Sequence, residues 1–167
     1  MASSITLDVT PGGEDSNSYN IVAQAETYLD GHLDESVWND NPEFQEAALV
    51  AAARQMNMLV YRGSRYSSTQ ALAFPRSVHV SSGNPYISQD VRFAQVEQAL
   101  FMLKQMVRGG SSDAREQLIA AGVTKAQIGD VVEEYEKPGI AQTRVTLSER
   151  ARGYLRPYLA GTVRRGF

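Results

Sequence analysis

The chain has 167 residues and a net charge of −3, and a domain of this size buries enough surface to be stable without disulfide or metal cross-links. It contains no cysteine, which excludes disulfides, thiolate metal sites and cysteine nucleophiles and fits a reducing cytosol. Residues 1–13 lack a basic region followed by an apolar one, and no run approaches the roughly 20 apolar residues of a membrane span, so we expect neither secretion nor membrane insertion.

Charge is distributed unequally along the chain. Residues 1–53 contain ten acidic residues and no lysine or arginine, whereas residues 144–167 contain six arginines and a single glutamate. This asymmetry favours head-to-tail packing of subunits, or a basic tail that binds an acidic partner. Charged, solvated surfaces at both ends are the alternative.

The N-terminal part predicts an arm followed by a first helix. Residues 1–17 are polar and include a Pro-Gly-Gly turn, which indicates a flexible arm with at most a short strand at residues 5–9. Ser18 or Asn20 can cap a helix whose apolar face comprises Val22, Ala25, Leu29 and Leu33. We expect Trp38, on the following connection, to cover the edge of the core.

A second helix is expected from Asn41, as its cap, to Gly63, with Pro42 in its first turn. The helical period places one continuous face toward the core, comprising Leu49, Ala52, Ala53, Met56, Leu59 and Val60.

The central region continues with a loop over residues 63–76 and a hairpin or projecting loop over residues 77–88, centred on a Ser-Gly-Asn-Pro turn. A third helix is expected over residues 89–108, ending at Gly109-Gly110. Its broad apolar face makes it the partner of the second helix in the core.

The C-terminal region predicts a short helix over residues 113–122, a strand with an acidic run over residues 126–136, and a final helix capped by Thr146 that kinks or stops at Pro157. The aromatic, arginine-rich end has little reason to fold back on its own domain and is expected to serve as an arm for a partner.

These elements predict a mainly α fold, a small bundle of three to four helices with a short β-hairpin or projecting loop and extended N- and C-terminal arms. We divide the chain into a flexible N-terminal arm at residues 1–17, a helical domain at residues 18–143 and a C-terminal docking arm at residues 144–167.

Little in the sequence indicates catalysis. His32 and His79 are the two histidines, and neither has metal-ligand spacing, so we expect no metal, no cofactor and no enzymatic activity. An enzyme would need a set of carboxylates gathered around His79.

A nucleic-acid interpretation has more support. Residues 61–66 alternate arginines with aromatic rings, and single strands bind through phosphate neutralisation and base stacking. The candidate DNA or channel contacts are Arg62, Arg65, Tyr66, Arg76 and His79. In the alternative, structural interpretation, Tyr61 and Phe74 are core residues, and Arg62 and Arg65 bond to loop carbonyls.

Several short motifs, in order and spacing, resemble one family across most of the chain. They are Ser18-Tyr19, Ala25, Tyr28-Leu29, Trp38, Ala47-Ala48-Leu49, Ala53-Arg54, Gly63, residues 70–76 (QALAFPR), Ala94, Ala99-Leu100 and Ile128-Gly129-Asp130. The sequence resembles the head-to-tail adaptor proteins of tailed bacteriophages, also called head completion or connector proteins, some of which carry the label DnaT-like ssDNA-binding. The chain departs from the usual family pattern at Phe74, where tryptophan is more common.

The resemblance implies a structural virion protein of the phage neck, assembled in the host cytoplasm. Such proteins form a ring, commonly of twelve copies, that binds the portal protein, continues the DNA channel and meets the next neck or tail protein. We expect the C-terminal arm to bind the portal through Arg152, Tyr154, Leu155, Arg156, Tyr158, Arg164, Arg165 and Phe167, and the loop at 77–88 to contact the next ring or the channel. The second function implied by the resemblance is a DnaT-like single-stranded DNA-binding module.

Overall fold

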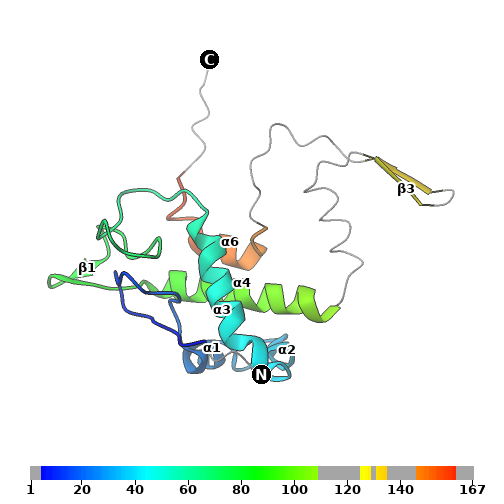
Figure 1. Cartoon of the computed structure of the whole chain (residues 1–167), viewed down its shortest axis with the longest axis horizontal. Coiled ribbons are helices and arrows are strands. Elements are labelled where there is room, and N and C mark those ends of the chain that lie inside the picture. Colours follow the sequence, from blue (N-terminus) through cyan, green and yellow to red (C-terminus); the bar gives the residue numbers. More distant parts are fainter. Residues whose placement is uncertain (1–4, 109–124, 129–130, 135–145, 161–167) are drawn as a thin grey trace, which may run out of the picture. The chain divides into compact units, whose positions relative to one another are not determined.

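The computed structural model describes residues 5–108, 125–128, 131–134 and 146–160 (Figure 1). The chain divides into two compact units, Met1–Leu103 with Leu147–Phe167, and Lys104–Thr146. The mainly helical fold is confirmed, and so is a small antiparallel hairpin. The elements are α1 (Val22–Leu29), α2 (Glu35–Asn39), η1 (Pro42–Phe44), α3 (Gln45–Asn57), β1 (Val80–Ser81), β2 (Asn84–Pro85), α4 (Gln89–Arg108), β3 (Lys125–Ile128), β4 (Val131–Glu134) and α6 (Glu149–Leu155).

The segment before α1 is a hydrogen-bonded loop, and no strand forms at residues 5–9, where we expected at most a short one. The backbone N–H groups of Asn17 and Ser18 both donate to the Asp8 carbonyl, while the Asn17 side chain bonds to Thr6 and Asp8. The Ala71 N–H donates to the Gly13 carbonyl. The segment therefore contacts the loop that follows α3.

The division of the chain into an N-terminal arm, a helical domain and a C-terminal docking arm stays a prediction.

The first helix is shorter than expected, since α1 ends at Leu29 and Leu33 is 93% exposed. Gly31 follows the end of the helix with a φ of 75°, and glycine adopts this left-handed conformation without strain. The interpretation of Trp38 as an edge residue was also wrong. It lies on α2, is fully buried, and belongs to the centre of the core.

The second helix is also shorter than expected. It starts as the 3-10 turn η1 and continues as α3, which ends at Asn57 instead of reaching Gly63. Asn41 does not cap it, because its side-chain amide donates to the carbonyl of Val37. The expected face is buried from Leu49 to Met56, but Val60, beyond the helix end, is 73% exposed.

The third helix is confirmed, because α4 spans the expected residues. Before it, β1 and β2 pair antiparallel around a two-residue turn, Ser82-Gly83, with φ angles of 50° and 81°. Two successive positive φ angles match the twist of a tight hairpin. The hairpin alternative for residues 77–88 is therefore correct.

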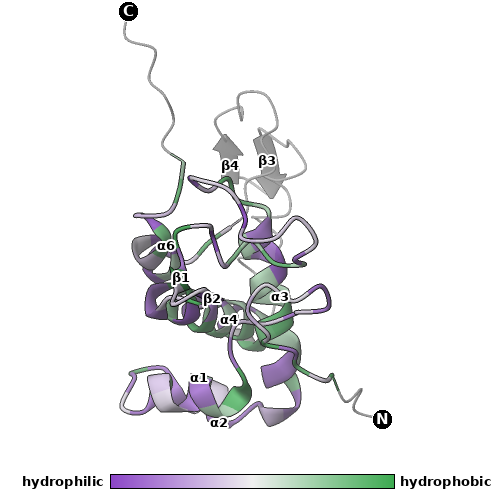
Figure 2. Ribbon diagram, turned by 90° about the vertical axis from the view of Figure 1, so that its left-hand side faces the viewer, coloured by the Kyte–Doolittle hydropathy of each residue, from purple (hydrophilic) through white to green (hydrophobic). Residues whose placement is uncertain are grey.

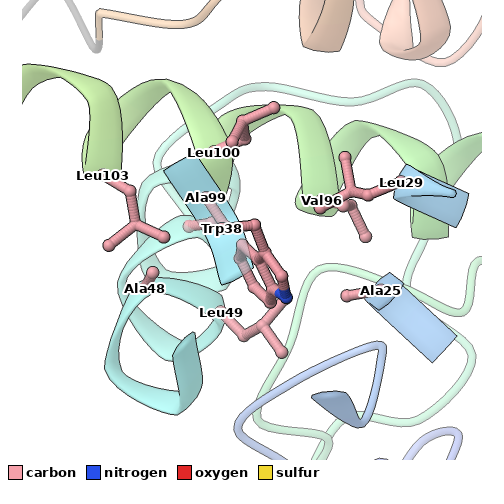
Figure 3. Packing of buried hydrophobic residues seen from close by; sticks show 10 residues of the cluster. Ala25, Leu29, Trp38, Ala48, Leu49, Val96, Ala99, Leu100 and Leu103 are labelled. Atoms are coloured by element: carbon pink, nitrogen blue, oxygen red, sulfur yellow. The ribbon is translucent and has the colours of Figure 1, made fainter. Parts of the chain in front are cut away.

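Helices α1 to α4 share one core in which apolar side chains from α1, α2 and α3 pack on α4. Figure 3 shows the Trp38 ring lying between Leu49 of α3 and Ala99 of α4. Figure 2 shows hydrophobic and hydrophilic residues alternating along α3 and α4, as expected of helices with one buried face. No described helix is both long and apolar enough to cross a bilayer.

Two buried glutamines of α4 connect this helix to its surroundings. Gln95 accepts from the backbone N–H of Tyr19 (3.0 Å) and donates to the carbonyl of Leu49 (2.8 Å). Gln98 donates to Gln55 of α3 (2.6 Å) and accepts from the Ser148 N–H (2.8 Å). Because a buried amide is costly without partners, these bonds favour a single arrangement of α3, α4 and α6.

The start of the C-terminal segment packs onto its own unit, contrary to the expectation. Ser148, two residues after the predicted cap, caps α6 by accepting from the Ala151 N–H (3.0 Å), and Ala151 and Leu155 are fully buried. The helix ends at Leu155, before Pro157 as expected. Leu159 then forms a β-bridge with Tyr61.

In the second unit, β3 and β4 form an antiparallel hairpin with Lys125 opposite Glu134. The expectation of one strand at residues 126–135 thus becomes a strand pair. The helix expected at residues 113–122 lies outside the described residues.

Candidate nucleic-acid interface

The loop after α3 is organised by Arg76, which is 8% exposed. Its guanidinium donates to the carbonyls of Arg62 (3.1 Å), Tyr61 (3.3 Å), Ala73 (3.4 Å) and Gly63. Burial lowers the pKa of Arg76, yet a guanidinium stays charged in proteins. Arg76 therefore holds the loop from inside, which corrects the expectation that it contacts DNA.

A second buried side chain completes this support. Gln70 accepts from the Ser67 N–H (2.9 Å) and donates to the carbonyls of Leu72 (2.7 Å) and Pro75 (3.0 Å). Its own carbonyl accepts from the Arg65 guanidinium (3.2 Å). The loop is thus fixed at both ends by amide and guanidinium groups.

Arg62, Arg65 and Tyr66 lie on the exposed side of this supported loop. Arg62 is anchored through its backbone, whose N–H donates to the Tyr158 carbonyl (2.8 Å). Its side chain has no hydrogen bond or ion pair with any described residue. Tyr66 is 42% exposed, and its ring lies so close to Gly12 that a Cβ there would sit 3.1 Å from it. The structure brings these three candidate residues together at the surface.

His79 is not part of that surface. It is buried among the rings of Phe74, Tyr86 and Tyr158, with centroid distances of 5.8, 5.7 and 5.4 Å. Its Nδ1 accepts from the Arg76 N–H (3.2 Å), and burial, together with the Arg76 charge, lowers the pKa of His79. A neutral, buried imidazole is a structural group, so the expectation that His79 contacts DNA is corrected as well.

The structural interpretation of Tyr61 and Phe74 is confirmed. Both side chains are buried, with their rings edge-on at 4.7 Å, and the Tyr61 hydroxyl donates to the Met56 carbonyl (2.8 Å). Arg65 also bonds to a loop carbonyl, as that interpretation expects, but the Arg62 side chain bonds to no described carbonyl. Arg76 makes most of the bonds to loop carbonyls.

The expected portal-binding residues fall into four groups. Leu155 is fully buried and is therefore not available as a surface anchor. Tyr154 and Tyr158 are half-buried, and the Tyr158 hydroxyl bonds to Ser88 and Asp90. The exposed members are Arg152 and Arg156, while Arg164, Arg165 and Phe167 lie outside the described residues.

Sequence reasoning missed a second group of polar and aromatic side chains. Tyr28, Glu97, Arg150 and Tyr154 meet beside a pocket, although Tyr28 and Tyr154 are separated by 126 positions. No local motif indicates such a meeting, because each residue alone resembles an ordinary helix position. Within the described ranges, no three His, Asp or Glu side chains could hold a metal ion.

A model of the family described as "Putative DnaT-like ssDNA binding protein" matches residues 4–166 of the chain. Neither the curated proteins nor the solved structures gave a match.

Proposed function

Because the chain belongs to the DnaT-like ssDNA-binding family, we propose that it binds single-stranded DNA. The observation that carries this proposal is the grouping of Arg62, Arg65 and Tyr66 at the surface of a loop fixed by buried Arg76. We assign the protein no enzymatic activity and no cofactor.

The three side chains supply the two interactions that single-strand binding requires. Arg62 and Arg65 can each neutralise a phosphate, and the exposed Tyr66 ring offers a stacking face for a base. Since Arg76 and Gln70 already hold the backbone, DNA would meet a pre-organised loop, and little ordering entropy would oppose binding.

The test is fluorescence anisotropy of a labelled oligothymidylate titrated with the protein at low salt. We expect Tyr66→Ala to weaken binding about tenfold, the consequence of losing one base stack, while Tyr66→Phe, which keeps the ring, retains the wild-type affinity. Equal affinity for the alanine and phenylalanine variants would exclude stacking on Tyr66. No binding by the wild type at tens of micromolar would exclude the function.

A second candidate function is that of a head-to-tail adaptor in a phage neck. The observation that favours it is the contrast between the acidic residues 1–53 and two exposed arginines, Arg152 of α6 and Arg156, which directly follows that helix. Complementary surfaces of this kind suit a ring built from heterologous contacts, in which one face of a subunit meets a different face of the next. On this proposal the chain is a virion protein that binds the portal and the next neck or tail protein, and DNA passes through its ring.

Co-sedimentation with purified portal rings tests the adaptor candidate. We expect wild-type chain to co-sediment and the Arg152→Glu/Arg156→Glu double variant to remain in the supernatant, because both charges that face an acidic partner are reversed. Arg54→Glu, a charge reversal at an exposed position of α3, tests for a general surface effect and should still co-sediment. Co-sedimentation of both the double variant and Arg54→Glu would contradict docking through Arg152 and Arg156.

A further inference from the structure

Three aromatic rings from distant parts of the sequence form a cluster beside α4. Tyr28 of α1 and Phe93 of α4 lie 4.4 Å apart between centroids, and Tyr154 of α6 lies 5.6 Å from Phe93. All three side chains are half-buried, so part of each ring faces solvent. Two pockets, of about 380 and 500 Å³, share Tyr28 in their walls.

The larger pocket contains a buried carboxylate. Glu97 is 5% exposed, and its Oε1 accepts from the Tyr28 hydroxyl (2.7 Å) and lies 3.3 Å from His32 Nε2 and 3.6 Å from Arg150 Nη1. Burial raises the pKa of Tyr28, so its hydroxyl remains a donor to this carboxylate. The hydrogen bonds and ion pairs of the Glu97 side chain with described residues are all made through Oε1.

The smaller pocket contains an incompletely bonded group. Arg92 lines it, and the Arg92 Nε is buried without a hydrogen-bond partner among the described residues. A buried N–H without a partner is costly, and such groups in native proteins often mark a place where water or a ligand binds. Arginine is therefore present on both sides of the aromatic cluster, Arg92 in one pocket and Arg150 in the other.

The charges restrict the kind of ligand that fits the larger pocket. A phosphate would meet the Glu97 carboxylate at close range, and an isolated cation would meet Arg150. A neutral, planar heterocycle avoids both repulsions. It can stack on a tyrosine ring, donate an N–H to the carboxylate and accept a bond from the guanidinium.

We propose that the pocket lined by Tyr28, His32, Glu97, Arg150 and Tyr154 binds an unpaired nucleobase. This inference rests on the proposed single-stranded DNA binding and adds a base-reading site to the phosphate-binding loop. Tyr154 or Tyr28 stacks on the base, Glu97 accepts from a ring or exocyclic N–H, and Arg150 donates to a carbonyl or ring nitrogen. These roles resemble the way single strands are read at base edges and stacked on aromatic side chains.

A charge-removing pair of variants tests the role of Glu97. General electrostatics predicts that loss of a negative charge strengthens DNA binding. The nucleobase site predicts the opposite for Glu97→Gln, about tenfold weaker binding of an oligodeoxycytidylate, because the amide replaces an acceptor with a donor at the base edge. Glu149→Gln, on the exposed start of α6, removes the same charge outside the pocket and should bind as tightly as wild type or more tightly.

Thermal melting of each variant shows whether the fold persists. Glutamine keeps the shape of Glu97 and still offers an oxygen to the Tyr28 hydroxyl. A folded Glu97→Gln variant that binds as tightly as Glu149→Gln would overturn the base-reading site. In that case, single-stranded DNA binding by the wild-type protein would still support the proposed function. If Glu97→Gln does not fold, Tyr154→Leu replaces it, and the expected result is again about tenfold weaker binding.

A second measurement separates the pocket from the loop. Deoxycytidine 5′-monophosphate, titrated at millimolar concentration, should shift the ring resonances of Tyr28 and Tyr154 in two-dimensional NMR spectra. Deoxyribose 5-phosphate, which lacks the base, should leave them unchanged. Shifts caused equally by both compounds, or by neither, would contradict nucleobase binding even if the protein binds long single strands.

Discussion

At the scale of single residues, Arg76 shows how one side chain can determine where other arginines point. Its guanidinium donates hydrogen bonds to carbonyls on both sides of the loop, and its planar, fork-shaped set of N–H donors makes four such bonds possible. As a result Arg62 and Arg65 remain at the surface, where their charges are available to a phosphate. Arg76 is therefore a positioning residue for the proposed DNA contact.

Replacing Arg76 by alanine should destabilise the fold by about 2–4 kcal/mol, because it leaves several buried carbonyls without donors. Arg76→Lys should recover only part of this loss, since an ammonium cannot reproduce the fork. Urea unfolding monitored by circular dichroism measures both values. Arg62→Ala, a change on the exposed side of the same loop, should lie within about 0.5 kcal/mol of wild type. An Arg76→Ala variant as stable as Arg62→Ala would contradict the bracing role.

His79 gives a pH-dependent stability. Its folded-state pKa is lowered by burial and by Arg76, so on acidification the unfolded chain takes up a proton before the folded one does. The stability contribution is therefore complete above the ordinary histidine pKa of about 6.5 and is lost as pH falls below it.

Melting temperatures measured between pH 7.5 and 5.5 test this effect. The wild type should lose stability over this window, whereas His79→Gln should be less stable at pH 7.5 but nearly independent of pH. A wild-type slope in His79→Gln would show that other groups are responsible.

At the scale of elements, the short helix α6 closes the core. Leu155 is fully buried, Gln98 of α4 accepts from the Ser148 N–H, and Leu159 pairs with Tyr61 beyond the helix end. Because these contacts join α6 to α4 and to the loop that presents Arg62 and Arg65, the integrity of the candidate DNA surface depends on the C-terminal segment.

Deleting the chain from Gly153 onward should therefore destabilise the domain by more than 2 kcal/mol, since the loss of Leu155 alone removes a fully buried leucine. Differential scanning fluorimetry of the wild type and of the chain ending at Arg152 measures this difference. Equal melting temperatures for wild type and the chain ending at Arg152 would refute a core role for α6.

The outcome for particular residues shows what sequence patterns can predict. Helix α4 and the Ser82-Gly83 turn were predicted because their signals are local: a long apolar period in one case and turn residues in the other. Trp38 and Leu155 were misplaced because their burial depends on helices far away in the sequence. Arg76 and Arg62 have the same chemical character, and only the carbonyls that surround Arg76 distinguish a bracing arginine from an exposed one.

At the scale of the whole molecule, a net charge of −3 does not favour nucleic-acid binding by general attraction. Binding must instead come from local groups, the exposed arginines and the aromatic surfaces. The unequal distribution of acidic and basic residues along the chain is compatible with ring assembly in a phage neck. On these two proposals, single-stranded DNA binding and adaptor function are alternative uses of one fold. The salt dependence of DNA affinity reports local phosphate contacts directly.

The decisive measurement is therefore the slope of the logarithm of DNA affinity against the logarithm of salt concentration, for wild type and for Arg62→Ala/Arg65→Ala. Each phosphate contact with single-stranded DNA contributes about 0.7 to this slope, so the double variant should show a slope smaller by about 1.4. Arg54→Ala, an exposed arginine of α3, should keep the wild-type slope. Identical slopes for wild type and the double variant would contradict DNA binding by the loop.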